Sequence, residues 1–395
     1  MAESAPEVPG LRVLGMISGT SIDAIDVAVA EFRSAGEVLQ MRPLGHGERP
    51  WPSRLRADLL GVLPPNPSDV GTWCRLDAEA GQAFGDAAAW TIREFGPVDL
   101  IASHGQTLHH WVSDGRARGS LQIGGAAWIH EATRVPVVND LRSADIAAGG
   151  QGAPLASTLD ALWLGDQPTA ALNLGGIANI TVVGTGDAAV SGDTGPASCL
   201  LDAAAASLLG QPSDLNGAAA ARGRVDDGAL RQLLADPYYT LPLPKSTGRE
   251  HFHSGYVAER LGSGTLEVAD LFATLTELTA VTVADAVNRA GVSRVVASGG
   301  GLRNPTLLHR LRTHLDVPLL STADLGIDPD AKEAYLFALL GYLSATGRPG
   351  TIQQATGARR PVVLGSLTPP SSLRPHGGAA SPPIHRVHVV QGGSQ

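Results

Sequence analysis

The stretch Leu11–Phe32, LRVLGMISGTSIDAIDVAVAEF, decides the fold class. Its apolar residues Leu11–Met16 predict a strand, the glycine and hydroxyl residues that follow predict a turn, and Val27–Phe32 predict a second strand. The same order of strand, glycine turn and strand recurs at residues 170–183, AALNLGGIANITVV. The two hairpins indicate either two similar α/β lobes or a chance likeness, since glycine-rich turns are common.

Elsewhere, short apolar runs alternate with longer stretches of helical period. Further strands are expected at Leu100–Ser103, Val135–Val138, Ala170–Leu174, Ile180–Val183 and Val295–Ser298. Helices are expected at Leu76–Phe95, Ala197–Leu209, Asp227–Ala235, Leu266–Ala290 and Ala331–Ala345. This alternation predicts an α/β architecture with mostly parallel central sheets.

Composition limits the class of protein. With 395 residues, of which 43% are apolar, the chain is long enough for two or three domains with hydrophobic cores. The net charge of −9 provides no general basic surface, so we expect neither a nucleic-acid partner nor an anionic membrane surface. An anionic ligand must therefore be bound by a local site.

Cysteine content and the N-terminus predict the compartment. Cys74 and Cys199 are too few for a disulfide framework and match no zinc spacing, which indicates a reducing environment. No basic and apolar leader is present, and no window holds 18 consecutive apolar residues. We expect a cytoplasmic protein without a membrane span.

The turn within Gly15–Asp26, GMISGTSIDAID, is a candidate phosphate site. A glycine turn after a strand gathers backbone N–H groups, and its serine and threonine hydroxyls add donors. Asp23 and Asp26 could hold a metal ion or stabilise the turn. The segment is neither a Walker loop nor a GxGxxG fingerprint, and an ordinary hairpin with capping hydroxyls is the alternative.

A second candidate is Gly192–Pro196, GDTGP, which is expected at a strand-to-helix corner. Ligands of open α/β sheets bind at such corners, where Asp193 would present its carboxylate. Alternatively, Asp193 or Thr194 caps the helix expected to begin near Ala197.

Other polar segments allow both functional and structural interpretations. The three glycines of ASGGGLRNP, residues 297–305, permit close approach to a ligand but also suit a flexible loop. His104 could be structural, Arg142 could be solvated, and Glu333 could be a surface partner within its helix. The hexapeptide KSTGRE at 245–250 contains Lys245, one of only two lysines, and favours a functional loop over a linker.

Taken together, these motifs resemble the 1,6-anhydro-N-acetylmuramic acid kinase family of the sugar kinase, heat-shock ATPase and actin superfamily. The resemblance covers about residues 11–366. Its ordered segments are GMISGTSIDAID, SHGQT, LQIGG, DLRSADIAAGGQGAPL, LNLGGIANIT, DTGP, PKSTGRE, LTAVTVADAV, SGGGLRNP and the helix start at Asp328–Ala338. Ten segments in one order are far more specific than any one of them.

The resemblance implies two ribonuclease-H-like lobes with mixed central sheets flanked by helices and an active-site cleft between the lobes. Lobe I would comprise residues 10–142 and 358–366, and lobe II residues 143–357. Residues 1–9 and 367–395 are polar or rich in Pro, Gly and Ser, and are expected to be disordered ends outside both lobes.

The resemblance also implies ATP, Mg²⁺, a small-molecule sugar substrate and a homodimer. In the family's reaction, the 1,6-anhydro ring is hydrolysed while O6 is phosphorylated, which yields N-acetylmuramic acid 6-phosphate and ADP during peptidoglycan recycling. Asp193 corresponds to the family's general base. Nucleotide-binding positions are Gly19, Thr20, Ser21, Ile22, Asp23, Ala24, Ile25, Asp26, Thr194, Gly195, Gly299, Gly300, Gly301 and Asn304. Sugar-binding positions are His104, Gln106, Thr107, Arg142 and Glu333, and the metal positions are Asp23 and Asp193.

Two departures from the family pattern keep alternatives open. The family usually continues DTGP with Gly-Asn, where this chain has Ala197 and Ser198. It also usually carries DFRRRD, where this chain has Ser143 and Ala144 in place of two arginines. Because a lactyl carboxylate needs a cation, a simpler anhydrosugar such as levoglucosan is an alternative substrate. A catalytically silent sugar or nucleotide sensor is the alternative outside enzymes.

Overall fold

The computed structural model describes residues 10–186, 189–248, 250–262, 266–369 and 384–389. Contacts divide the chain into unit 1, residues 1–163 and 331–395, and unit 2, residues 164–330. These boundaries differ from those expected after residues 142 and 357. The reason is that the segments 143–163 and 331–357 pack with the first sheet, as α12 (Lys332–Ala345) shows most clearly.

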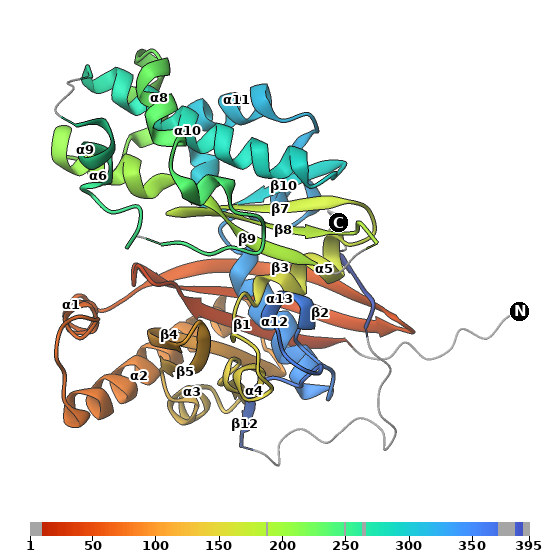
Figure 1. Cartoon of the computed structure of the whole chain (residues 1–395). Coiled ribbons are helices and arrows are strands. Elements are labelled where there is room, and N and C mark those ends of the chain that lie inside the picture. The colour runs from red at the N-terminus through yellow and green to blue at the C-terminus, as the bar shows by residue number, and fades with distance from the viewer. Residues whose placement is uncertain (1–9, 187–188, 249, 263–265, 370–383, 390–395) are drawn as a thin grey trace, which may run out of the picture. The chain divides into compact units, whose positions relative to one another are not determined.

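Unit 1 contains one large sheet and helices on both of its faces (Figure 1). Its strands are β1 (Leu11–Ser18), β2 (Ala24–Ala35), β3 (Val38–Pro50), β4 (Leu100–Ser113), β5 (Arg116–Ile123), β6 (Val137–Asn139), β12 (Ser366–Thr368) and β13 (Arg386–Val389). Its helices are α1 (Ser53–Gly61), α2 (Val70–Phe95), α3 (Ala126–Thr133), α4 (Ser143–Ala147), α5 (Ala156–Leu164), α12 and α13 (Gln353–Thr356).

Unit 2 contains a smaller sheet packed against long helices. Its strands are β7 (Thr169–Leu174), β8 (Ile177–Val183), β9 (Val190–Pro196), β10 (Arg294–Ser298) and β11 (Leu319–Ser321). Its helices are α6 (Ser198–Leu208), α7 (Ala218–Arg222), α8 (Asp227–Leu234), α9 (Tyr256–Leu261), α10 (Val268–Arg289) and α11 (Pro305–His314). The 3₁₀ turns η1 to η4 cover Leu215–Gly217, Pro237–Thr240, Gly300–Arg303 and Thr322–Leu325.

The two sheets share one topology, which confirms the α/β class and resolves the question of the two hairpins. Unit 1 contains the order β3-β2-β1-β4-β6, and unit 2 has the order β9-β8-β7-β10-β11. In each unit the first three strands are antiparallel neighbours and the last three are parallel neighbours. The sheets are therefore mixed, as expected for ribonuclease-H-like lobes, rather than mostly parallel. The likeness between the two hairpins reflects the same arrangement repeated in both units.

Successive side chains of β1 point to opposite faces of the sheet, so this one strand packs against helices on both faces. Leu14 and Met16 belong to the core cluster that includes Leu76 and Phe84 of α2. Gly15 faces the opposite way, and a Cβ there would collide with the backbone of Ala334 and Ala338 in α12. Because successive side chains of a strand point to opposite faces, β1 places a buried helix on each side of the sheet.

The expectation that everything beyond residue 366 lies outside the fold is wrong, because two C-terminal segments add strands to the first sheet. β12 pairs with β6 in antiparallel register, and β13 pairs with β3 in parallel register. Val387 of β13 is fully buried. Apolar residues in β13 alternate with polar ones, but the flanking Pro and Gly hide this pattern in the sequence. The expectations for residues 1–9, 370–383 and 390–395 lie outside the described residues.

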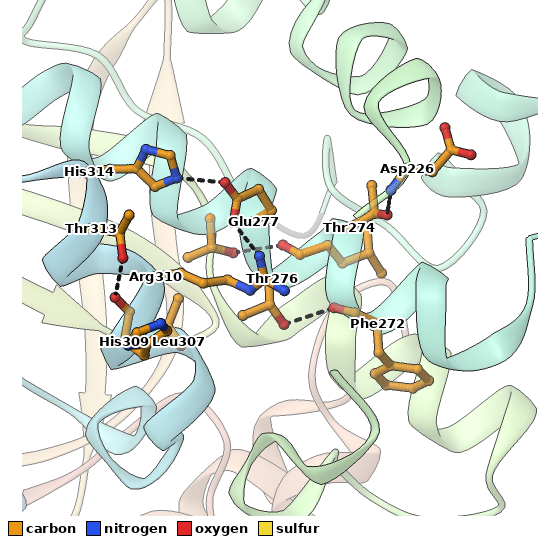
Figure 2. A network of polar contacts seen from close by, with 12 residues as sticks. Asp226, Phe272, Thr274, Thr276, Glu277, Leu307, His309, Arg310, Thr313 and His314 are labelled. Carbon is orange, nitrogen blue, oxygen red and sulfur yellow. Dashed lines mark hydrogen bonds and ion pairs between the residues drawn. The ribbon is translucent and has the colours of Figure 1, made fainter. Parts of the chain in front are cut away.

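In unit 2, polar contacts join the two helices α10 and α11 (Figure 2). Glu277 of α10 accepts from Arg310 Nη1 at 2.6 Å and from His314 Nε2 at 2.5 Å. Within α10, Thr276 Oγ1 donates to the carbonyl of Phe272 at 2.8 Å. The pairing complements the apolar contacts through which Val283 and Leu311 join one core.

Candidate active site

The first glycine turn follows β1 in unit 1. Its backbone closes through the N–H of Ile22, which donates to the carbonyl of Gly19 at 3.1 Å. Gln106 Nε2 donates to the same carbonyl at 3.2 Å, so the SHGQT motif on β4 supports this turn. Trp51 Nε1 donates to the buried Ser18 Oγ at 3.0 Å. The turn is therefore held from two sides.

The residues of this turn differ in what they can offer a nucleotide. The side chains of Thr20, Ser21 and Asp23 are exposed. Those of Ile22 and Ile25 lie in the hydrophobic core, so these two residues can meet a ligand only through their backbone. The remaining expected positions, Ala24 and Asp26, lie with Ile25 in the first residues of β2.

Asp23 lies near a cation of its own unit. Its Oδ1 is 3.7 Å from Arg56 Nη2, and the Asp23 side chain is 71% exposed. Arg56 Nε also donates to the carbonyl of Ile22 at 2.6 Å. The arginine thus fixes the outer side of the turn, and the Asp23 carboxylate stays accessible to a ligand.

Gln106 and Thr107, two of the positions expected near the sugar, lie on β4. Gln106 is fully buried, and its Oε1 has no hydrogen-bond partner among the described residues. Thr107 Oγ1 accepts from Gln122 Nε2 at 3.1 Å. A buried amide oxygen without a partner costs free energy, so Gln106 is suited to a bound donor.

His104 and Arg142 form a buried pair in unit 1. Arg142 Nε donates to His104 Nε2 at 2.9 Å, and His104 Nδ1 donates to the carbonyl of Gly105 at 3.1 Å. Burial, followed by the positive charge of Arg142, lowers the pKa of His104 to about 3. The neutral imidazole therefore accepts from the guanidinium, which leaves His104 no free ring nitrogen.

The other end of Arg142 is held as well. Its Nη1 donates to the carbonyl of Gly152 at 2.5 Å. Glu333, at the start of α12, is exposed and lies near enough to attract the Arg142 charge. The structure thus brings three of the expected sugar-binding residues, His104, Arg142 and Glu333, into one neighbourhood.

The segment that departs from the family's arginine pattern is well ordered by hydrogen bonds. Ser143 Oγ donates to Asp140 Oδ1 at 2.6 Å. Asp145 is fully buried and accepts from the N–H of Gly152 and from Thr356 Oγ1, both at 2.7 Å. These bonds position Arg142 without the two missing arginines.

In unit 2, Asp193 lies on the edge strand β9, three residues before the strand ends. Its Oδ2 accepts from the N–H of Thr247 at 2.9 Å and from Ser246 Oγ at 3.2 Å. Its Oδ1 makes no hydrogen bond within the described part of the chain. One carboxylate oxygen is therefore fixed and the other is available.

Burial raises the pKa of Asp193 above its ordinary value. The hydrogen bonds from Thr247 and Ser246 and the charge of Lys245 oppose this effect, whereas the charge of Glu250 adds to it. A carboxylate with a raised pKa is a stronger base than an exposed one.

The helix-cap alternative for the DTGP segment is wrong. Helix α6 begins after Ala197, and no side chain caps it. Thr194 is buried instead, and its Oγ1 donates to the carbonyl of Ala178 at 3.2 Å. Gly195 has φ +151°, and a Cβ there would lie 2.8 Å from the ring of Tyr239. Thr194 and Gly195 are therefore both buried in β9, so any contact with a phosphate would be made by their backbone.

The third glycine loop follows β10 in unit 2. Gly299 has φ +89°, and a Cβ there would lie 2.6 Å from Asn173 Oδ1. Gly301 is similarly close to Leu174, whereas Gly300 faces open space. The expected ligand Asn304 caps α11 by accepting from the N–H of Leu307 at 2.9 Å. This loop presents an exposed backbone next to the end of β7.

Sequence reasoning did not identify Ser246 and Thr247 as the residues that hold Asp193, although it singled out the segment that contains them. The signal was the lysine of KSTGRE in a chain that has only one other. The spacing of 54 residues between Asp193 and Thr247 gives no local pattern that links them.

The expected metal positions, Asp23 and Asp193, belong to different units, and the predicted cleft between the lobes stays a prediction. Within the described ranges, no group of three or more His, Cys, Asp or Glu side chains is arranged to hold a metal ion. Nor do those ranges contain a helix with the length and apolar character to cross a membrane.

Comparisons with known proteins identify the family of this chain. A family profile described as anhydro-N-acetylmuramic acid kinase matches residues 11–370. A protein of that name from Streptomyces coelicolor is 51% identical over 392 residues, which cover 97% of this chain and 100% of the relative. Another from Rhodococcus erythropolis is 49% identical over 91% of this chain and 95% of the relative.

The solved xylulose kinase from Rhodospirillum rubrum has a TM-score of 0.44 at 15% identity, with 84% of this chain and 90% of that chain covered. From the profile match and the two sequence relatives, the chain belongs to the anhydro-N-acetylmuramic acid kinase family.

Proposed function

We propose that this chain uses ATP and water to convert 1,6-anhydro-N-acetylmuramic acid into N-acetylmuramic acid 6-phosphate and ADP, with Asp193 as the general base. The observation that carries the proposal is the hydrogen bonding of the Asp193 carboxylate together with its burial. One carboxylate oxygen is held by Thr247 and Ser246, the other makes no hydrogen bond among the described residues, and burial raises the pKa of Asp193. The names of the relatives at 49 to 51% identity supply the substrate.

The chemistry needs one base and one trapped leaving group. Asp193 takes a proton from water, and the water oxygen attacks C1 of the sugar as the C1–O6 bond breaks. O6 then carries the released electron pair and attacks the γ-phosphorus of ATP, which breaks the bond to ADP. No general acid for O6 is required, because phosphoryl transfer consumes its charge.

The nucleotide would be bound chiefly by backbone groups. The chain has only two lysines, and the turns at Gly19–Asp26 and Gly299–Gly301 contain neither of them and leave backbone accessible, whereas Thr194 and Gly195 are buried in β9. Backbone N–H groups in such turns suit phosphate oxygens. The residues present therefore fit ATP.

Each of the two expected metal positions, one in each unit, also suits Mg²⁺. Oδ1 of Asp193, which makes no hydrogen bond within the described ranges, and the exposed carboxylate of Asp23 are each a hard oxygen ligand of the kind that Mg²⁺ prefers. When bound, the ion would neutralise phosphate charge during transfer.

On the sugar side, Arg142 is the cation that would meet the lactyl carboxylate. Its guanidinium is held by His104 and Gly152, and Glu333 lies nearby to accept from sugar hydroxyls. A single well-fixed arginine can make a charge-assisted hydrogen bond to a carboxylate. The absence of arginine at 143 and 144 therefore does not exclude the muramate.

The test is to incubate the purified chain with ATP, Mg²⁺ and either 1,6-anhydro-N-acetylmuramic acid, levoglucosan or no sugar, and to measure ADP. ADP formation that depends on the muramate supports the proposal. A preference for levoglucosan would reassign the substrate, and a melting shift with a sugar but no ADP would indicate a silent sensor. Size-exclusion chromatography with light scattering tests the proposed homodimer, and cell fractionation tests the proposed cytoplasmic location.

A further inference from the structure

Asp236 is a buried carboxylate in unit 2 that the proposed chemistry does not use. It is 1% exposed, yet its Oδ2 accepts from His251 Nε2 at 2.9 Å, Tyr256 OH at 2.9 Å and Arg260 Nη2 at 2.5 Å. Its Oδ1 accepts from the N–H of Tyr238 at 2.9 Å. Burial raises its pKa, but these hydrogen bonds and Arg260 more than offset this and hold the pKa below its ordinary value. Asp236 is therefore a fixed anionic anchor.

Tyr238 connects this anchor to Asp193. Its N–H binds Asp236, and its hydroxyl donates to the backbone carbonyl of Asp193 at 2.8 Å. The ring is 7% exposed and is flanked by Phe252, with centroids 5.8 Å apart. Burial raises the pKa of Tyr238, so the hydroxyl stays protonated and keeps its role as a donor.

Lys245 connects Tyr238 to the segment that binds the Asp193 carboxylate. Its Nζ donates to the carbonyl of Tyr238 at 2.9 Å and lies 4.3 Å from the centre of the Tyr238 ring. Its carbonyl accepts from the N–H of Asp193 at 2.9 Å. The next two residues, Ser246 and Thr247, donate to Asp193 Oδ2.

Gly192 allows this segment to approach β9. A Cβ at Gly192 would lie 2.8 Å from the carbonyl oxygen and 2.9 Å from the nitrogen of Lys245. Any side chain there would push the segment away from Asp193. Tyr238 and Lys245 thus hold the backbone of Asp193, and the two residues that follow Lys245 hold its carboxylate.

We propose that Tyr238 and Lys245 are positioning residues for Asp193, anchored by Asp236. This inference rests on the proposed function, in which Asp193 must face the attacking water. Neither residue touches the reacting atoms. Their loss would release the 245–247 segment and let the carboxylate leave its productive orientation, and a displacement of about 1 Å in a catalytic group can cost about 100-fold in rate.

The kinetic test compares Tyr238→Phe, Lys245→Met and Lys245→Arg with the wild type. Tyr238→Phe removes only the hydroxyl that holds Asp193, and Lys245→Met removes the ammonium. We expect kcat to fall by about 10-fold or more in both variants, with KM for sugar and ATP within about twofold. Lys245→Arg keeps a cationic donor and should recover most of the loss.

The matched control is Tyr239→Phe. Tyr239 lies in the same 3₁₀ turn, but its buried hydroxyl faces Tyr256, and no hydrogen bond joins it to Asp193 among the described residues. This variant loses the same atom as Tyr238→Phe and should keep kcat within about twofold. An equal loss of kcat in both tyrosine variants would overturn the proposal, and so would a change confined to KM.

A second measurement separates this inference from the proposed reaction. Amide hydrogen exchange of Thr247 reports the hydrogen bond to Asp193 whether or not the chain turns over the sugar. We expect exchange at Thr247 to accelerate by about 10-fold in Tyr238→Phe and Lys245→Met but not in Tyr239→Phe. If the wild type makes no ADP, faster exchange in those two variants still supports positioning. Unchanged exchange would overturn it even in an active enzyme.

Discussion

The Nε–H of Arg142 donates to Nε2 of His104 at 2.9 Å, and this contact fixes the protonation state of His104 and the orientation of Arg142. The imidazole must be neutral to accept, and its other nitrogen is engaged by the carbonyl of Gly105. Arg142 in turn is held in one orientation beside Glu333. We therefore expect His104 to act on the sugar through Arg142 rather than by direct contact.

His104→Phe tests that expectation. The phenyl ring can keep the contact with Phe337, whose ring centre lies 4.6 Å from that of His104, but it removes the acceptor for Arg142. We expect KM for the sugar to rise by about 10-fold while KM for ATP stays unchanged, because a hydrogen bond to a charged group contributes about 1.5–3 kcal/mol. Steady-state kinetics measure both constants. His130→Phe, which removes a histidine bonded to the carbonyl of Val135, is the control. An unchanged sugar KM in His104→Phe would contradict the role.

The same histidine predicts a pH dependence of stability. Its pKa is about 3 in the folded state, below its ordinary value of 6.5, so between these values the unfolded chain binds a proton that the folded chain does not. The contribution of neutral His104 is present above pH 6.5 and is lost as pH falls toward 3. Between pH 7.5 and pH 5 this amounts to roughly 2 kcal/mol. Urea unfolding at both pH values should show a smaller loss in His104→Phe than in the wild type. Equal losses would show that His104 carries no such linkage.

The second lysine is structural. Lys332 Nζ forms an ion pair with Asp160 Oδ1 at 2.7 Å, without an aligned hydrogen bond, and both side chains are less than a tenth exposed. Lys332→Met leaves a buried carboxylate without its cation and should lower the free energy of unfolding by about 3–5 kcal/mol. Denaturant titration measures the loss. Lys332→Met combined with Asp160→Asn should restore a large part of it. If the double variant is no more stable than the single one, the ion pair is not the cause.

Asp193→Asn tests the proposed base. The amide cannot take the proton from water, so we expect turnover to fall by at least ~10². The oxygen of the new side chain can still accept from Thr247, and ATP binding measured by calorimetry should be preserved. Turnover close to that of the wild type would assign the base to another residue.

Gly15→Ala tests the packing of β1 against α12. The added methyl group would collide with backbone atoms of Ala334 and Ala338, which cannot move without displacing the helix that begins beside Glu333. We expect a loss of roughly 3 kcal/mol or more in stability, seen as a lower melting temperature. Gly36→Ala, at a turn position with open space but φ +63°, should cost about 1 kcal/mol. Equal losses at the two glycines would contradict the packing argument.

The sequence by itself determined the elements and the motifs. Short apolar runs and stretches of helical period located β1, β2, β7, β10, α10 and α12 to within a few residues and α2 apart from its first six residues, because buried positions shape each local pattern. It missed β3, where apolar and polar residues do not alternate regularly, and β13, which is flanked by Pro and Gly.

Only the tertiary structure decided which polar groups meet. The Asp193 carboxylate is held by Thr247, and Arg142 is held by His104, across 54 and 38 positions of chain. No local pattern records such pairs, because they form only when segments distant in sequence pack against one another in the folded chain. The tertiary structure also separates the two lysines. Lys245 lies beside the segment that binds the proposed base, whereas Lys332 is buried with Asp160. Residue type and spacing identified the chemical groups, whereas burial and partners set their charge and orientation.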